Sequence, residues 1–297
     1  MRAWYADHFV LPLPDTHRFP MDKYRRLRER VAAELPGVVL CEPPAATDAE
    51  LGRAHDPAYI ARVSRGELST PEIRVIGFPW SPQMIDRSRR SAGATMAACR
   101  AALRDGISVN LAGGTHHAKY ASGAGYCVFN DAAVATRMLQ AECGIERVAI
   151  IDLDVHQGDG TAEILGHADN AFTLSLHGEH NFPFRKEHSH LDVALPDGTG
   201  DDAYLAALDD ALAAMTRQFD PQFVIYLAGA DPYAGDRLGR LKLGKAGLAS
   251  RDTRVFDYCQ QRNLPLAAAM AGGYAENIDD IVDIHFATVA QALRRCG

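Results

Sequence analysis

Short, nearly continuous apolar runs alternate with amphipathic stretches from about residue 107 to the end of the chain. Continuous apolar runs of this kind are typical of strands that helices cover on both faces. The alternation predicts an α/β fold with a central parallel sheet, helices on both of its faces and right-handed crossovers. The predicted strands are Ile107–Ala112, Arg147–Leu153, Ala171–Leu176, Phe223–Ala228 and Pro265–Ala271, and the predicted helices are Ser81–Arg104, Asn130–Cys143, Asp201–Gln218, Gly247–Arg262 and Glu276–Arg295.

The first eighty residues are less regular, and there the pattern predicts one helix over Met21–Leu35. The sequence has no internal repeat, no low-complexity tract and no linker. Its 297 residues are within the range of one α/β sheet with two helical layers. We therefore expect a single domain over residues 1–297.

Composition narrows the classes of partner. The formal net charge of −7 argues against direct binding of nucleic acid, because phosphate binding needs concentrated Lys and Arg. Arginine clusters at residues 25–30 and 87–90 lie on predicted helices and are interpreted mainly as solvated faces. Six scattered cysteines indicate reduced thiols, and no apolar run is long enough to cross a bilayer. The N-terminal residues lack the apolar core of a signal peptide, so we expect a cytoplasmic protein that does not bind membranes.

Polar or glycine-rich clusters follow the predicted strands at their carboxyl ends. In open parallel sheets, ligands bind beyond these ends, so five segments far apart in sequence are expected to converge on one rim. The clusters are Gly113–His117, Asp152–Asp159, Ser175–His177, Gly229–Asp231 and Gly272–Tyr274.

The densest cluster predicts a metal site. Asp152, Asp154 and His156 are spaced two residues apart, so in an extended chain their side chains point to the same side. Asp154 and His156 supply two ligands, and Asp231 is the natural third for a catalytic zinc site that keeps one position open for water. The alternative is that the acidic residues only cap the following helix, Gly158–Leu165. Three aspartates and a histidine in one cluster favour the metal.

His116 and His117 are candidates for general acid and base, because neutral imidazole titrates near the working pH. Asp152 and Asp159 are available to orient the two rings. Tyr274 follows two glycines that let the backbone approach a substrate; taken alone, it is more often an aromatic residue of the core.

The motifs resemble the histone deacetylase family, of the arginase/deacetylase superfamily, and within it the bacterial members related to class IV deacetylases. They occur in the family's order over roughly residues 17–285. The residues that carry the resemblance are Gly113–His117, Gly125–Asp131, Asp152–Gly160, Gly229–Pro232 and Gly272–Tyr274.

The resemblance implies a single-domain deacetylase-like fold and hydrolysis of an acyl amide on lysine side chains of peptides or proteins. It implies zinc on Asp154, His156 and Asp231, and proton transfer by His116 and His117, backed by Asp152 and Asp159. Tyr274 is then the hydrogen-bond donor to the substrate carbonyl. The further residues that it implies are Gly125, Tyr126, Phe182, Phe184 and Leu238 for substrate binding, Arg25 for an inner cavity that receives the freed acid, and Asp152, Ser175 and Leu176 for a structural potassium, with backbone carbonyls of Asp154 and His156.

One departure from the family's pattern bears on the substrate. Gly77 stands where the family carries an aspartate that grips the substrate backbone at the rim. A small acylated amine, such as an acetylpolyamine, therefore remains an alternative to a peptide.

Other readings also stay open. An Asp–His–Asp set is compatible with Fe(II) as well as zinc. An arginase-like two-manganese hydrolase is less favoured, because the chain offers one dense Asp/His edge plus Asp231. A catalytically silent acyl-binding module is a further alternative, but the complete set of His116, His117, Tyr274 and the three metal ligands argues against it. A nucleotide-binding protein is the weakest rival, since the G-x-G-x-x-G spacing is absent. The sequence makes no prediction of an oligomeric state.

Overall fold

The computed structural model describes residues 1–11, 13–14 and 17–296. Eight strands form one sheet in the order β2-β1-β3-β8-β7-β4-β5-β6, and every neighbouring pair is parallel. The predicted α/β class with a central parallel sheet is therefore confirmed. The strands are β1 (Arg2–Trp4), β2 (Val39–Cys41), β3 (Ile107–Asn110), β4 (Val148–Asp152), β5 (Ala171–Gly178), β6 (Leu191–Leu195), β7 (Phe223–Leu227) and β8 (Leu266–Ala269).

The five predicted strands correspond to β3, β4, β5, β7 and β8, which form the middle of the sheet. Strands β1, β2 and β6 were not predicted. Strands β1 and β2 are three residues each, and β6 is partly exposed along its length, so these outer strands lack the continuous apolar run of a buried strand.

Ten helices pack around the sheet in the described part of the chain. The predicted helices are found at nearly their expected bounds. The ten helices are α1 (Asp22–Glu34), α2 (Asp48–Leu51), α3 (Pro57–Arg65), α4 (Thr70–Ile76), α5 (Pro82–Asp105), α6 (Asp131–Glu142), α7 (Asp159–Leu165), α8 (Asp201–Gln218), α9 (Lys245–Gln261) and α10 (Ile278–Arg295).

Three short helices between residues 48 and 76 were missed, although their start signals are in the sequence. Thr47 and Glu50 form a capping box at α2, and Ser69 and Glu72 form one at α4. Asp56 caps α3, whose first residue is a proline. These helices are too short to show a clear apolar period.

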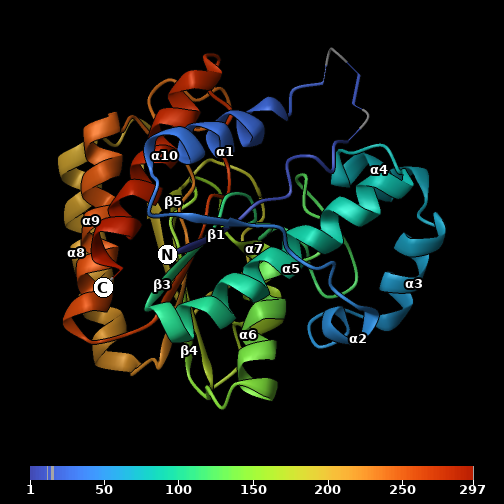
Figure 1. Cartoon of the computed structure of the whole chain (residues 1–297), viewed down its shortest axis with the longest axis horizontal. Helices are drawn as coiled ribbons and strands as arrows, with labels where there is room; N and C mark the ends of the chain where they lie inside the picture. The colour runs from blue at the N-terminus through green and yellow to red at the C-terminus, as the bar shows by residue number, and fades with distance from the viewer. Residues whose placement is uncertain (12, 15–16, 297) are drawn as a thin grey trace.

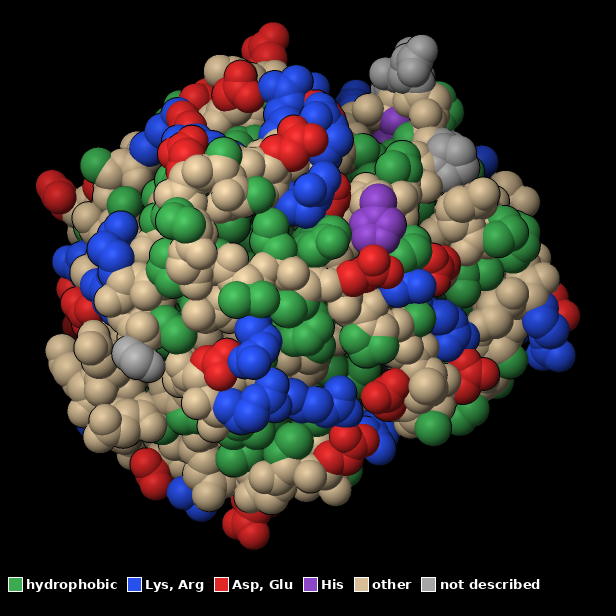
Figure 2. All heavy atoms as spheres, in the orientation of Figure 1, with side chains coloured by type: hydrophobic (Ala, Val, Ile, Leu, Met, Phe, Trp, Pro, Cys, Tyr) green, Lys and Arg blue, Asp and Glu red, His purple; other side chains and the backbone are tan. Residues whose placement is uncertain are grey.

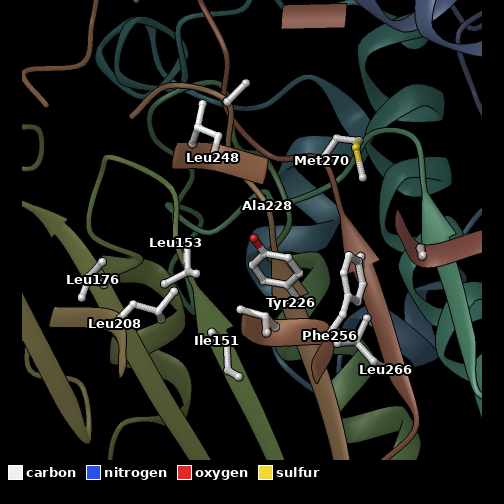
Figure 3. Packing of buried hydrophobic residues seen from close by; sticks show 14 of the residues in the cluster. Ile151, Leu153, Leu176, Leu208, Tyr226, Ala228, Leu248, Phe256, Leu266 and Met270 are labelled. Carbon is white, nitrogen blue, oxygen red and sulfur yellow. The ribbon is translucent and has the colours of Figure 1, made fainter. Parts of the chain in front are cut away.

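Two apolar layers separate the sheet from its helices. Side chains along each strand alternate between the layers: Ile151 and Tyr226 face one side, and Ile150 and Ile225 face the other. Helices α1, α8, α9 and α10 cover the first side, where Tyr226 packs among Phe256, Leu266 and their neighbours (Figure 3). Helices α5 and α6 cover the second side, and α2, α3 and α4 lie beyond them at the right of Figure 1.

No helix in the described ranges is both long and apolar enough to cross a membrane.

Candidate active site

The polar clusters that follow the central strands meet at the carboxyl edge of the sheet. Asp154 and His156 follow β4, and Asp231 follows the adjacent strand β7. Tyr274 follows β8, which lies next to β7, and His117 follows β3, which lies next to β8. Parallel strands end at the same edge, so these loops converge, as the sequence predicted.

Asp154, His156 and Asp231 form one buried cluster. The potential ligand atoms of the three side chains all lie within 4.8 Å of one another. His156 Nδ1 is 2.9 Å from Asp154 Oδ1 and 3.3 Å from Asp231 Oδ2. This is the only group of three or more Asp, Glu, His or Cys residues with such spacing among the described residues.

Some carboxylate oxygens of this cluster accept hydrogen bonds and one does not. Asp231 Oδ1 accepts a hydrogen bond from the backbone N–H of Val155 at 2.9 Å, and Asp154 Oδ2 accepts one from Gly272 at 2.8 Å. Asp231 Oδ2 is buried without a hydrogen-bond partner among the described residues. Burial, and secondly the negative charge of Asp154, raises the pKa of Asp231 to about 7. Both facts indicate a site that is built for a cation.

Gly272 keeps this cluster accessible. A Cβ atom at this position would clash with carboxylate oxygens of both Asp231 and Asp154. The residue types and the available space therefore fit a divalent metal ion on two carboxylates and one imidazole.

Two histidine–aspartate pairs stand beside the cluster. His116 Nδ1 is 2.6 Å from Asp152 Oδ2, and His117 Nδ1 is 2.6 Å from Asp159 Oδ1. All four side chains are buried. These are the pairings expected from the sequence, and each leaves the Nε2 atom of its ring turned away from its aspartate partner.

The two imidazoles differ in charge. Burial lowers the pKa of His116, but the negative charges of Asp152 and Asp154 outweigh it and raise the pKa to about 9. Burial and the nearby charge of His116 lower the pKa of His117 to about 4, despite its hydrogen bond to Asp159. At neutral pH one ring carries a proton to give and the other has a free nitrogen to accept one.

The loop that carries these histidines is fixed by residues whose role the sequence analysis missed. The Asn130 side chain donates to the backbone carbonyls of His116 and Ala118, at 3.3 and 3.1 Å. The backbone N–H of Asn130 in turn donates to His55 Nε2 at 2.8 Å. The next residue, Asp131, accepts from the backbone N–H groups of Gly114 and Thr115. Two adjacent polar residues after a buried phenylalanine were the available signal.

Tyr274 is held by its backbone. Its N–H donates to Asp236 Oδ2 at 2.6 Å, and its carbonyl accepts from Arg237 Nε at 2.9 Å. Its ring lies 6.4 Å from that of His156, between centroids. Burial raises the pKa of the Tyr274 phenol, so its hydroxyl remains a proton donor. Tyr274 also lines the main cavity, so it is more than a core residue. Asp236 is a further residue whose role was not predicted from the sequence.

A cavity of about 540 Å³ leads to the cluster, and the five residues expected for substrate binding all line it. The Phe182 ring packs edge-on against His117 at 4.9 Å, whereas Phe184 is 87% exposed. Tyr126 has a positive φ of 67° and packs on the aromatic rings of Phe19 and Phe78. The lining residues that were predicted are Gly125, Tyr126, Phe182, Phe184 and Leu238.

Comparison with known proteins identifies the family to which the chain belongs. The family model described as the histone deacetylase domain matches residues 17–289. The chain belongs to the histone deacetylase family. It is thus a histone deacetylase-family hydrolase.

Several relatives cover most of the chain. An uncharacterized protein of Picosynechococcus sp. is 41% identical over 285 residues, which are 95% of this chain and 94% of that protein. Histone deacetylase 2 of Arabidopsis thaliana is 32% identical, over 88% of this chain and 70% of that protein. The histone deacetylase-like amidohydrolase of Pseudomonas aeruginosa is 31% identical, over 78% of this chain and 65% of that protein.

The fold is similar to that in the crystal structure of the HDA15 HD domain. The TM-score is 0.82 over 99% of this chain and 91% of that one, at 22% sequence identity.

The structure places Arg25 away from the cavity, contrary to the expectation from the family. Arg25 lies on the exposed face of α1, where it pairs with Asp22 at 2.7 Å and Glu29 at 2.8 Å. Helical geometry explains the difference, because Lys23, Leu27 and the rest of the buried face lie on the other side of the helix. The Lys23 side chain is 2% exposed, and its Nζ donates to the Gly273 carbonyl at 3.1 Å.

The second arginine cluster also departs from its interpretation as a solvated face. Arg87 is 9% exposed and donates to the backbone carbonyls of Ala6 and Phe9. Its guanidinium lies over the Tyr24 ring at 4.5 Å. Arg87 is therefore part of the packing between α5 and α1.

The residues that the family resemblance implied for potassium lie together. Asp152 and Ser175 are register partners on β4 and β5, and the Ser175 hydroxyl is 3.0 Å from His177 Nδ1. The Leu176 side chain belongs to the core, so only its backbone carbonyl is available as a ligand. A role in potassium binding stays a prediction.

Proposed function

We propose that this protein is a zinc-dependent deacylase that hydrolyses an acyl amide on a lysine side chain of a peptide or protein. One observation carries the proposal: the buried Asp154–His156–Asp231 cluster lies beside two histidine–aspartate pairs at the base of a cavity lined by aromatic residues. These are the parts that metal-assisted amide hydrolysis requires.

Asp154, His156 and Asp231 would hold the metal. The chemistry that a zinc ion would supply there is polarisation of the acyl carbonyl and a lowered pKa of a bound water molecule. Asp152 and Asp159 fix the orientation of the two neighbouring imidazoles through their Nδ1 atoms, which leaves both Nε2 atoms for proton transfer.

The two histidines divide the proton transfers. His117, whose lowered pKa leaves Nε2 unprotonated at neutral pH, removes a proton from the attacking water. His116, whose raised pKa keeps it protonated, supports the negative charge that develops and, with His117, returns a proton to the leaving amine. The Tyr274 hydroxyl donates a hydrogen bond to the carbonyl oxygen as that oxygen becomes negative. Phe182 and Tyr126 line the cavity above and limit the access of water.

Hydrolysis of a small acylated amine is the second candidate. The observation that favours it is Gly77, which lines the cavity where the family carries a substrate-gripping aspartate. A carrier that lacks a peptide backbone would not need that contact.

The test combines metal analysis with turnover. The protein is stripped with a chelator, reconstituted with Zn²⁺ or Fe²⁺, and assayed with fluorogenic lysine peptides of increasing acyl length. We expect turnover only in the metal-loaded forms. A metal-loaded protein that binds acyl peptides tightly without hydrolysing any of them would instead indicate a silent binding module.

A further inference from the structure

The mouth of the cavity has an unbalanced positive charge. Arg74, from α4, and Arg240, from the loop after β7, both line it, together with His180 from the loop after β5. The one carboxylate among the lining residues is Asp154, which belongs to the metal cluster at the base. Basic side chains thus approach the mouth from three separate elements, and no acidic side chain of the described residues lines it there.

Nearby carboxylates only partly neutralise these cations. No ion pair joins Arg74 to a carboxylate in the described ranges, and the nearest acid in α4, Glu72, pairs with Arg62 at 2.8 Å. Arg240 and His180 share a single carboxylate, that of Asp197, at 3.1 and 3.3 Å. Among the described residues, two arginines and a histidine at the mouth therefore have one carboxylate, that of Asp197, as their ion-pair partner.

A further arginine adjoins the mouth. Arg237 donates to backbone carbonyls, those of Tyr274 at 2.9 Å and Arg18 at 3.4 Å, and forms no ion pair with a described carboxylate. It lines a smaller hollow of about 270 Å³ that shares Leu238 and Tyr274 with the main cavity. The excess of basic side chains therefore extends beyond the mouth of the main cavity.

The chain as a whole does not share this positive balance. The chain has a formal net charge of −7, and the exposed arginines of α1 are paired with acids on the same helix or on α10. Basic and acidic side chains are interspersed over the face shown in Figure 2. A positive mouth on an acidic protein focuses its field on the entrance, where it attracts anions and repels cations.

We infer that the substrate is an acylated amine whose carrier bears a carboxylate at the end away from the acylated nitrogen, where the carrier reaches the mouth. This inference rests on the proposed function, in which the acyl group lies at the base and the carrier lies at the mouth. Acyl-lysine flanked by Asp or Glu, and a small ω-acylamino acid, both present this chemistry. Acylated polyamines present the opposite charge at the same place, so the mouth disfavours the small-amine alternative in its cationic form.

The first experiment uses two substrates of equal chain length. 6-Acetamidohexanoate and N-acetylcadaverine differ only in the charge of the group at the far end of the carrier. We expect kcat/KM to be roughly five- to tenfold higher for the carboxylate at low salt, and the ratio to approach one in about 0.5 M NaCl, because exposed charges are screened.

A second arm uses acetyl-lysine peptides flanked by Glu, Gln or Lys. A preference in the order Glu, Gln, Lys identifies a protein or peptide carrier. Discrimination within the small-molecule pair alone identifies a small carboxylate carrier. Both results support the inference.

Charge reversal assigns the preference to the mouth. The double variant Arg74→Glu, Arg240→Glu is expected to lose or invert the order of the matched substrates, with kcat/KM for each expressed relative to that for the neutral Gln peptide. Arg104→Glu is the matched control, because Arg104 is exposed at the end of α5, on the opposite edge of the sheet. This control should keep the wild-type order.

Two results would overturn the inference. Hydrolysis of the neutral peptide with no preference in either substrate set, or a preference that the double variant leaves unchanged, would remove the charge recognition and leave the proposed function intact. Absence of turnover on every substrate by the metal-loaded protein would remove the proposed function and this inference with it.

Discussion

At the scale of single residues, the site depends on polar groups whose surroundings give them different roles. His116 and His117 are adjacent in sequence, and each contacts an aspartate at 2.6 Å. Their pKa values differ because of their other neighbours. The negative charge of Asp154, which is 3.8 Å from His116 Nε2, raises the pKa of His116, whereas the positive charge of His116 lowers the pKa of His117. One ring thus favours the protonated form and the other the neutral form, which is what a proton relay requires.

Tyr274→Phe tests the proposed oxyanion contact. The variant keeps the ring and its packing but removes the hydroxyl, so kcat should fall about 100- to 1,000-fold with little change in metal content. Steady-state kinetics and elemental analysis measure the two quantities. Tyr120→Phe, at a residue that is 49% exposed, is the control and should retain activity. A Tyr274→Phe protein with the wild-type kcat would remove Tyr274 from the mechanism.

At the scale of secondary-structure elements, the site depends on how the long segment between β3 and α6, which carries His116 and His117, is held in place. The His55 ring contacts this segment at two points: its Nδ1 is 3.0 Å from the Lys119 carbonyl, and its Nε2 accepts from the N-cap residue of α6, Asn130, at 2.8 Å. Asn130 then holds the backbone of His116. The neutral form of His55 satisfies both contacts, because one nitrogen donates and the other accepts.

His55 should therefore make stability depend on pH. Burial lowers its pKa to about 4, below the value of about 6.5 in an unfolded chain. Between these values the unfolded state binds a proton that the folded state does not. The free energy of unfolding should thus fall as the pH decreases from about 6.5 to 4, by about 3 kcal/mol from this residue.

Urea unfolding of the wild type and His55→Gln at several pH values measures this contribution. The variant should be less stable than the wild type near pH 7 and lose less stability on acidification, so the two curves should converge toward pH 4. Curves that stay parallel across this range would show that His55 does not contribute to the pH dependence.

At the scale of the whole molecule, the sheet order brings ligands from two adjacent strands to one ion. Asp154 and His156 come from the segment after β4, and Asp231 comes from the segment after β7, about seventy-five residues away in sequence. An ion held by both segments would stabilise the folded chain by mass action, by about 4 kcal/mol at a thousandfold excess over Kd. The basic mouth is a property of the same scale, because its charges come from three separate elements.

Asp231→Asn should abolish the stabilisation of the folded chain by the metal. After dialysis against Zn²⁺ the wild type should retain about one equivalent, and chelation should lower its Tm. The variant should lose the metal, and its Tm should not respond to the chelator. Without metal, it should be at least as stable as the metal-free wild type, because a neutral amide replaces a buried carboxylate that has one oxygen without a hydrogen-bond partner and lies close to Asp154. Asp220→Asn, whose side chain is 93% exposed, should keep the metal. Full zinc content in Asp231→Asn would exclude Asp231 from the ligand set.

The sequence by itself determined the positions of the central strands and their parallel direction. It also determined that Asp154, His156 and Asp231 meet at one edge of the sheet. These follow from local rules: a buried strand is a continuous apolar run, strand–helix alternation makes neighbouring strands parallel, and parallel strands end at one edge. The spacing of Asp154 and His156 by two residues also belongs to this class.

Only the tertiary structure decided which charged residues are buried and which face solvent. The α1 sequence carries basic residues on several faces, and packing against β8 and its loop buried Lys23 and left Arg25 paired on the surface. Arg87 became buried by the same kind of contact, beneath Tyr24. The positive mouth could not be predicted from the sequence either, because Arg74, His180 and Arg240 are far apart in sequence and meet only when helix α4 and two loops fold over one cavity. Burial and long-range charge are properties of neighbours in space, which a one-dimensional pattern does not specify.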